Sequence, residues 1–297
     1  MLFALEVAIS GLLSGIMYSL VALGFVLIFK ASGVFNFAQG AMVLCAALTF
    51  VRLLELGVPF WIAAGITLIV MMVLAVVIER IVLRPLVNQP LIILFMATIG
   101  LNFFLEGLAQ GVWDAQVHGL QLGIDDLPWE PLANSTGMLI SIFDLSAALI
   151  CGVLVASLGV FFHKGRIGRA LRAVADDHQA AMAVGIPLQH IWAIVWAAAG
   201  IVALVAGALW GQRLGVQFSI SLVALKALPV LILGGLNSIS GVIVGGLLIG
   251  AGEKLAEVYL GPIIGGGIEN WFAYLLAMVF LLFKPYGLFG EEIIERV

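Results

Sequence analysis

Apolar runs long enough to cross a lipid bilayer recur from one end of this chain to the other. Hydrophobic residues make up 63% of the 297 residues and charged residues 10%, which is more apolar surface than a water-soluble domain of this size buries. The pattern predicts one all-α transmembrane domain, 1–297, built as a polytopic helical bundle of about eight to nine membrane segments, some of them broken or short. The predicted spans are 7–29, 38–56, 60–78, 91–112, 139–162, 191–211, 219–234, 241–258 and 267–283.

The distribution of lysine and arginine predicts the orientation of these spans, because cytoplasmic loops carry an excess of both residues. When the loop 164–187 is placed in the cytoplasm, Arg52, Arg213 and Lys254 lie outside and Lys226 lies within a span. We therefore expect a periplasmic or extracellular N-terminus, a retained first span and a cytoplasmic C-terminus. The nine basic residues that then lie inside are Lys30, Arg80, Arg84, Lys164, Arg166, Arg169, Arg172, Lys284 and Arg296.

The loop 164–187 is expected to hold a short helix with both ends marked. Asp176 or Asp177 is the predicted N-cap, because its carboxylate can accept from the first free backbone N–H groups. Gly185 can adopt the left-handed conformation that ends a helix, and Pro187 prevents the helix from continuing. About eight residues lie between these ends and span roughly 12 Å, too little to cross a bilayer. We expect this helix to lie on the cytoplasmic face, where a partner protein binds it.

The loop 113–138 is the longest on the outer side. It contains four acidic residues and no lysine or arginine, and Trp113 and Trp129 are suited to the membrane interface. Two interpretations are open: a solvated cap over the bundle, or a docking surface for an extracellular partner. The four acidic residues are Asp114, Asp125, Asp126 and Glu130.

Two polar, glycine-containing interruptions of the apolar pattern, 30–40 and 233–242, occupy corresponding places in the two halves of the chain. The run 219–250 would be about 48 Å long as one helix, too long for one span of a roughly 30 Å hydrocarbon core, so we expect a break near 234–241. Interrupted segments in matching positions point to a transport path. The polar side chains predicted to line it, each of which alternatively links two helices, are Tyr18, Ser19, Asn36, Gln39, Thr98, Asn102, Asn237 and Ser238.

Charged residues within the spans are costly and suggest function. Glu106 and Asp144 lie near the outer ends of their spans, where each can reach the interface. Lys226 either extends towards the interface, faces the path or pairs with a carboxylate. Glycines four residues apart let helices approach closely, either within the chain or at a subunit interface. These glycine pairs are Gly11/Gly15, Gly107/Gly111, Gly207/Gly211, Gly241/Gly245 and Gly246/Gly250.

Motifs of several other protein classes are absent from the sequence. It contains no phosphate-binding loop of the type Gly-x-x-x-x-Gly-Lys-[Ser/Thr], so we do not expect it to hydrolyse ATP. It has no His-Glu-x-x-His or Gly-x-Ser-x-Gly motif and no basic tract, so we expect no catalytic residues, no metal and no nucleic acid. Cys45 and Cys151 lie in apolar runs and are predicted to be small core residues.

Three stretches resemble the H-type permease of branched-chain amino acid ABC importers. The first stretch, Gly11-Leu-Leu-Ser-Gly-Ile-Met-Tyr-Ser to Lys30, is followed by Gly33-Val-Phe-Asn-Phe-Ala-Gln-Gly40. The second, Arg169-Ala-Leu-Arg-Ala-Val-Ala-Asp-Asp-His-Gln to Ile186, is similar to the cytoplasmic coupling segment of that family. The third is Gly234-Gly-Leu-Asn-Ser-Ile-Ser-Gly241 to Gly250. They occur in the expected order and extend over most of the chain, from residue 11 to residue 250.

The resemblance implies an importer subunit of the bacterial inner membrane that pairs with a related M-type permease, two cytoplasmic ATPases and a periplasmic substrate-binding protein. ATP and magnesium would be bound by the ATPases alone. Substrates would be branched-chain amino acids or similar small polar solutes, such as urea or short amides. Alternatives are a stand-alone secondary carrier or channel, and a homodimeric sugar-type ABC permease. The residues implied to couple to the ATPases are Asp176, Asp177, Ala180, Ala181, Gly185 and Ile186.

Overall fold

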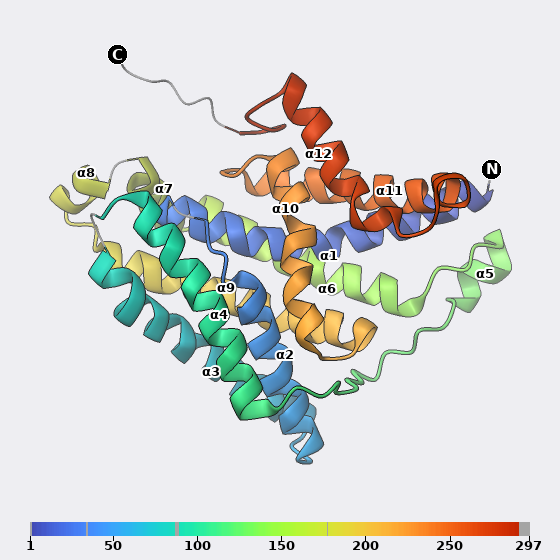
Figure 1. The fold of residues 1–297 in the computed structure, drawn as a ribbon, viewed down its shortest axis with the longest axis horizontal. Helices are drawn as coiled ribbons and strands as arrows, with labels where there is room; N and C mark the ends of the chain where they lie inside the picture. Colours follow the sequence, from blue (N-terminus) through green and yellow to red (C-terminus); the bar gives the residue numbers. More distant parts are fainter. Residues whose placement is uncertain (1, 34, 87–88, 177, 291–297) are drawn as a thin grey trace. The chain divides into compact units, whose positions relative to one another are not determined.

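The computed structural model describes residues 2–33, 35–86, 89–176 and 178–290, and their regular structure is helical apart from two isolated β-bridges (Figure 1). The all-α prediction is therefore confirmed. The α-helices are α1 (Leu2–Ser32), α2 (Gln39–Glu55), α3 (Phe60–Val77), α4 (Leu91–Trp113), α5 (Glu130–Thr136), α6 (Ile142–Lys164), α7 (Arg166–Asp176), α8 (His178–Ala183), α9 (Leu188–Leu214), α10 (Val223–Gly234), α11 (Ile239–Ile264) and α12 (Phe272–Phe283). The π- and 3₁₀-helices are η1 (Ile78–Leu83), η2 (Arg84–Leu86), η3 (Phe218–Leu222) and η4 (Ile268–Asn270).

Six helices of the described residues are long and apolar enough to cross a membrane. The predicted count of eight to nine is not confirmed, because two predicted spans contain shorter helices, Phe218–Gly234 and Phe272–Phe283, and α2 has only 17 residues. The six are Leu2–Ser32, Phe60–Leu86, Ile92–Trp113, Ile142–Lys164, Leu188–Leu214 and Ile239–Ile264.

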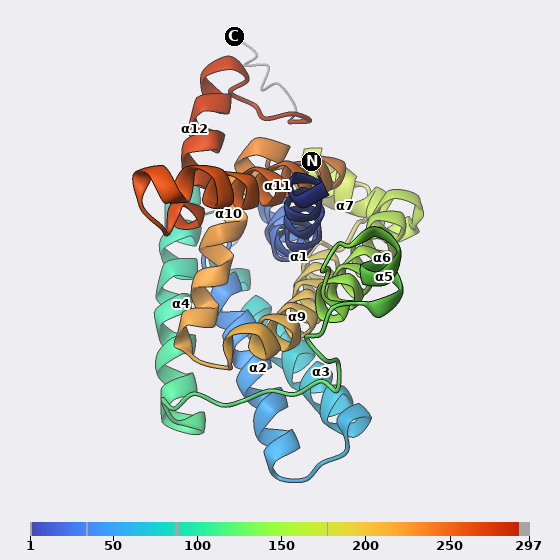
Figure 2. The ribbon, with the colours of Figure 1, turned by 90° about the vertical axis from the view of Figure 1, so that its right-hand side faces the viewer.

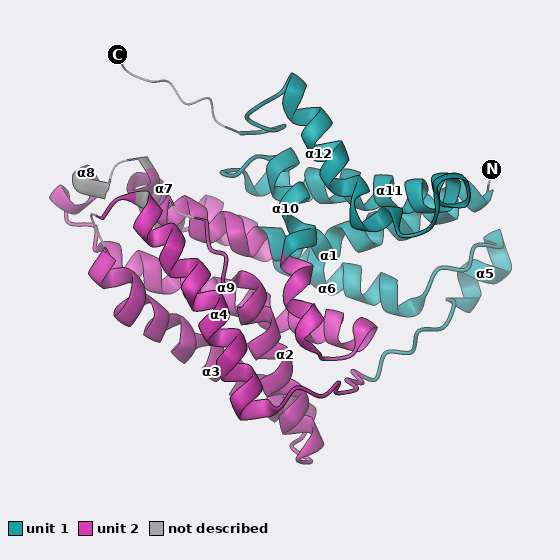
Figure 3. Ribbon diagram, in the orientation of Figure 1, with its two compact units in different colours: residues 1–22, 123–155, 225–297 teal, residues 23–122, 156–224 magenta. Residues whose placement is uncertain are grey.

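The described chain forms two compact units (Figure 3). Unit 1 comprises 1–22, 123–155 and 225–297, and unit 2 comprises 23–122 and 156–224. The boundary cuts through α1, α6 and α10, so each of these helices contributes to both units. That the whole chain is one transmembrane domain stays a prediction.

Helix α2 is the core of unit 2. Every residue from Gln39 to Val51 is buried, as expected of a helix that is apolar on all sides. It packs against α3, α4, α9 and η3, and Figures 1 and 2 show the first three alongside it. Glycine permits the close approach of α9, since a Cβ on Gly207 would lie 2.7 Å from the Val43 carbonyl oxygen. The Trp192 indole N–H adds a 3.0 Å hydrogen bond to the Ala31 carbonyl.

Unit 1 is built on glycine contacts between α1 and α11. A Cβ on Gly11 would lie 2.6 Å from the Gly250 carbonyl oxygen, and Gly15 meets Gly246 in the same way one turn further on. The Ser19 hydroxyl then donates across the same contact to the Val242 carbonyl at 3.1 Å. The intrachain packing interpretation is thus confirmed for Gly11/Gly15 and Gly246/Gly250. On α4, by contrast, nothing lies within 4 Å of a Cβ built on Gly107 or Gly111.

Both predicted interruptions are confirmed. Helix α1 ends at Ser32, followed by Gly33 with φ +69°, and α2 begins only at Gln39. Helix α10 ends at Gly234, and Gly235 turns the chain with φ +104°, a conformation that L side chains rarely adopt. The Ser238 hydroxyl caps α11 by accepting from the Gly241 N–H at 3.0 Å. Polar groups at this turn are therefore used to begin a new helix.

The predicted N-cap of the cytoplasmic helix is wrong for Asp176, which is the last residue of α7, while Asp177 lies outside the described residues. Helix α7 starts ten residues earlier because its apolar positions, Leu171 and Val174, are buried, and because Arg172 donates to the Phe162 carbonyl at the end of α6 at 3.1 Å.

The C-terminus predicted for the helix in loop 164–187 is confirmed. Gly185 has φ +86°, and the Ile186 N–H donates to the Ala181 carbonyl at 3.0 Å. The Gly185 N–H donates to the Met182 carbonyl, also at 3.0 Å. This pair of bonds is the Schellman arrangement that ends a helix after α8.

The glycine contact between α1 and α11 predicts that Gly246→Ala destabilises the protein by about 1–3 kcal/mol, since the new methyl group would collide with Ser19 and the Gly15 carbonyl. Gly107→Ala is the matched control, because the same methyl group enters open space on α4. Thermal unfolding of the detergent-solubilised protein measures both. Equal melting temperatures for the two variants would contradict the packing described for unit 1.

Candidate functional site

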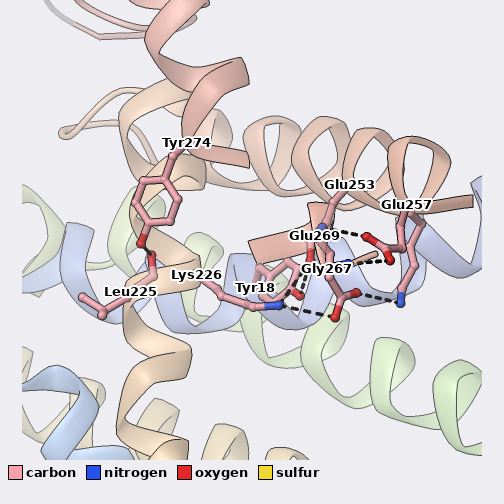
Figure 4. A network of polar contacts seen from close by, with 9 residues as sticks. Tyr18, Leu225, Lys226, Glu253, Glu257, Gly267, Glu269 and Tyr274 are labelled. Atoms are coloured by element: carbon pink, nitrogen blue, oxygen red, sulfur yellow. Dashed lines mark hydrogen bonds and ion pairs between the residues drawn. The ribbon is translucent and has the colours of Figure 1, made fainter. Parts of the chain in front are cut away.

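A network of charged side chains connects α1, α10, α11 and η4 within unit 1 (Figure 4). The Lys226 Nζ of α10 lies 3.4 Å from Oε1 of Glu253 on α11, and the Tyr18 hydroxyl of α1 donates to the same oxygen at 3.2 Å. Glu269 extends the network, with Oε1 4.0 Å from Lys226 and Oε2 3.3 Å from Lys254. Two lysines and two glutamates thus balance one another among otherwise apolar helices.

Burial makes the pairing of Glu253 necessary. This residue is 2% exposed, and an isolated buried carboxylate would be strongly unfavourable. The Lys226 side chain is 29% exposed, so one face of the ion pair remains open. Of the alternatives for Lys226, the structure shows pairing with a carboxylate. The ion pair therefore links α10 to α11.

The turn beside this network is held by the carboxylate of Glu257 on α11. It accepts from the Gly267 N–H at 3.0 Å and the Glu269 N–H at 2.9 Å, which positions Glu269 for its two lysines (Figure 4). Tyr274 of α12 donates to the Leu225 carbonyl at 2.7 Å. Side chains of α11 and α12 therefore bind the backbone of the turn and of Leu225, the residue that precedes Lys226.

A second polar group lies between α1 and α2, within unit 2. The Asn36 side chain is buried and accepts from the Ala38 N–H at 3.1 Å. The Thr98 hydroxyl of α4 donates to the Phe35 carbonyl at 3.2 Å. Gln39 opens α2 and is fully buried, but neither atom of its amide has a hydrogen-bond partner among the described residues.

Four aromatic rings surround this junction. Phe25 stacks on Phe35 with ring centroids 4.6 Å apart, and Phe35 meets the edge of Phe37 at the same distance. Phe37 in turn lies 4.9 Å from Phe95 of α4. The α1–α2 junction thus presents an aromatic surface beside buried amide groups.

The eight predicted path residues are divided between the two units, and their role in a path stays a prediction. In unit 1, Ser238 caps α11, and Tyr18 and Ser19 bond to α11. In unit 2, Thr98 and Asn36 bond to backbone, and Asn102 is half-buried on α4. The members in unit 1 are Tyr18, Ser19, Asn237 and Ser238, and those in unit 2 are Asn36, Gln39, Thr98 and Asn102.

At the end of α4, His118 lies between two carboxylates of unit 2. Its Nδ1 is 2.8 Å from Glu55 Oε1 and its Nε2 is 3.2 Å from Asp114 Oδ1. The pKa of the exposed Asp114 is lowered mainly by a hydrogen bond from the Gln116 N–H. The hydrogen bond with His118 lowers it further. Part of the acidic charge of loop 113–138 is therefore paired with residues of this chain. Whether the loop binds a partner stays open.

Glu253 was not among the residues expected from sequence. It lies 27 positions from Lys226, towards the outer end of the predicted span 241–258. The adjacent pair Glu253-Lys254 is typical of a solvated helix end, so it gave no reason to expect a buried carboxylate. The signal that points to it is the lysine itself, because a lysine in a membrane-spanning segment requires a counter-ion.

Comparison with known proteins supplies the family context. Residues 7–284 match the family model described as "Branched-chain amino acid transport system / permease component". The chain is 28% identical to the high-affinity branched-chain amino acid transport system permease protein LivH of Salmonella typhimurium over 312 residues, which covers 100% of this chain and 98% of that protein. It is also 28% identical to BraD of Pseudomonas aeruginosa, described in the same words, over 304 residues, with 99% and 98% coverage.

A solved structure, PsaBC from Streptococcus pneumoniae in complex with Fab, is similar at 17% identity and a TM-score of 0.46. The alignment covers 92% of this chain and 89% of the solved chain. A TM-score this low does not establish a shared fold.

The ion pair in unit 1 predicts a characteristic double-mutant cycle. Lys226→Met leaves Glu253 buried and uncompensated and should cost about 3–5 kcal/mol, whereas adding Glu253→Gln should recover most of that loss. Thermal unfolding of the four proteins in detergent measures the coupling. Lys254→Met is the matched control and should cost less, because its partner Glu269 is partly solvated. Additive effects of Lys226→Met and Glu253→Gln would refute the pairing.

Proposed function

The chain belongs to the family of branched-chain amino acid transport permeases, and we propose that it forms half of the translocation path of an ABC importer. The observation that carries this is the family match over residues 7–284, supported by relatives that align from end to end. The solutes would be branched-chain amino acids or similar small polar molecules. The relatives LivH and BraD are branched-chain amino acid permeases, which supports this substrate class.

We further propose that the chain is a non-catalytic subunit of the bacterial inner membrane, with a periplasmic N-terminus and a cytoplasmic C-terminus. The nine-to-three excess of basic residues supports this orientation. The other subunits would be a related M-type permease, two ATPases that bind ATP and magnesium, and a periplasmic binding protein. Family membership supports such an assembly.

The segment 176–186 is the proposed contact with the ATPases. In its described part, Met182 is 43% exposed and Val184 is 77% exposed, although the positive-inside pattern places this loop outside the bilayer. Exposed apolar side chains in a loop mark a protein contact. Ala181 is buried, so its side chain does not contribute to the exposed surface.

Movement of this segment would be transmitted through packed helices. Helices α7 and α8 both pack against α9, and Arg172 of α7 donates to the last turn of α6 through the Phe162 and His163 carbonyls. We propose that ATP-driven closure of the ATPases shifts α7 and α8 and tilts α6 and α9. Alternating access would follow from this rigid connection.

This proposal predicts that Met182→Glu with Val184→Glu abolishes co-purification of the ATPases from native membranes, because two charges replace the apolar contact. Gln189→Glu is the matched control. Gln189 is exposed on α9, seven residues after Met182 and five after Val184, and its replacement should leave the complex intact. Identification of the proteins that stay bound to the tagged chain gives the result.

Three other outcomes would contradict parts of the proposal. ATPases that remain bound to the double variant would show that the contact lies elsewhere. Recovery of ATPases with this permease alone would favour a sugar-type homodimer. A chain purified without any ATPase that still moves solute in liposomes would be a secondary carrier or channel.

A further inference from the structure

Gln39 is an unusual buried residue. It is 0% exposed, and both its Nε2 and its Oε1 have no hydrogen-bond partner in the described part of the chain. An unpaired buried amide destabilises a folded protein, so such groups are normally paired. Asn36, three residues earlier and equally buried, does have backbone and side-chain partners. Of these two neighbouring amides, only that of Gln39 has no partner among the described residues.

The position of Gln39 favours a negatively charged ligand. It is the first residue of α2, and the preceding residue, Ala38, supplies no side-chain cap. The N–H groups of a helix N-terminus attract anions, and side chains of the first turn tilt back towards that end. The N–H of Gln39 itself already donates to the Asn36 carbonyl at 3.2 Å, so the later N–H groups of the first turn would serve. The amide lies directly against α1 at Gly24, because a Cβ there would lie 2.5 Å from Nε2.

The neighbouring residues favour an aliphatic group. Phe35 and Phe37 precede Gln39 in the same short segment, are only half-buried, and continue the aromatic surface formed with Phe25 and Phe95. The Thr98 hydroxyl holds the Phe35 carbonyl in place. The buried amide and the two aromatic residues thus belong to one five-residue segment, 35–39.

We propose that the Gln39 amide and the first turn of α2 bind the α-carboxylate of the transported amino acid, while its branched side chain contacts Phe35 and Phe37. This inference rests on the proposed import of branched-chain amino acids. Gln39 then acts as a specificity residue: Nε2 donates to the carboxylate, and Oε1 can accept from the ammonium group of the same zwitterion. The partner missing from the protein would be supplied by the solute.

The test is ATP-dependent leucine uptake by the complete transporter, with Gln39→Met as the central variant. Methionine keeps the length of the side chain and removes only the amide. The maximal uptake rate should fall at least about tenfold, the scale expected for losing a hydrogen bond to a charged group. The melting temperature without solute should be unchanged or higher, because the variant removes an unpaired buried amide.

Ser14→Ala is the matched control. It removes a buried hydroxyl on α1 that, like the Gln39 amide, has no partner among the described residues, and it should leave uptake unchanged. Thermal shifts of the wild-type complex provide the chemical readout: leucine should stabilise it, whereas leucinol, which lacks the carboxylate, should not. Gln39→Met should abolish the shift given by leucine.

Two results would overturn the inference. Wild-type uptake by Gln39→Met would show that the amide does not meet the solute. A lower melting temperature or a failed assembly of Gln39→Met would show that the amide has a structural partner in the resting protein. A wild-type transporter that takes up no leucine would instead refute the proposed function, so the two failures are distinguishable.

Discussion

The structure depends on how charged and polar groups are paired among helices that are nearly all apolar. Lys226 and Glu253 illustrate the constraint, since neither is favourable in a membrane-spanning segment unless a counter-ion lies beside it. Their pairing fixes α10 to α11, and Tyr18 adds α1 to the same carboxylate. Glu269 extends the network to η4 and Lys254. This network thus links three helices and a turn in unit 1.

Close backbone contact supplies the remaining cohesion. Helices in lipid gain little from hydrophobic association with one another, so they require small residues and hydrogen bonds at their interfaces. Gly11 and Gly15 let α1 touch the backbone of α11, and Gly207 does the same for α9 on α2. The fully buried α2 shows the result, because each of its faces meets protein over Gln39–Val51. A side chain larger than glycine at these contacts would separate the helices.

Helix positions were predictable because they are recorded in local patterns. The apolar runs predicted most helices to within a few residues. Gly185 was predicted to be left-handed, and the break predicted near 234–241 contains Gly235, which has a positive φ. Asp176 was assigned wrongly because α7 is stabilised by buried Leu171 and Val174 and by Arg172, contacts that no local cap signal reports. Glu253 and the unpaired amide of Gln39 depend on residues distant in the chain. No periodicity in the sequence contains that information.

A transport path requires polar groups with hydrogen-bonding capacity that the protein does not use itself. The predicted path residues differ in this capacity, because some already donate to backbone groups of the described residues and others do not. The hydroxyl protons of Ser19 and Thr98 are committed to backbone carbonyls, which suits them to linking helices. Gln39 has two donors and a carbonyl oxygen without a partner among the described residues, although its side chain is 0% exposed. This difference in unused hydrogen-bonding capacity is why Gln39, and not Ser19 or Thr98, is the path residue that we propose to contact the solute.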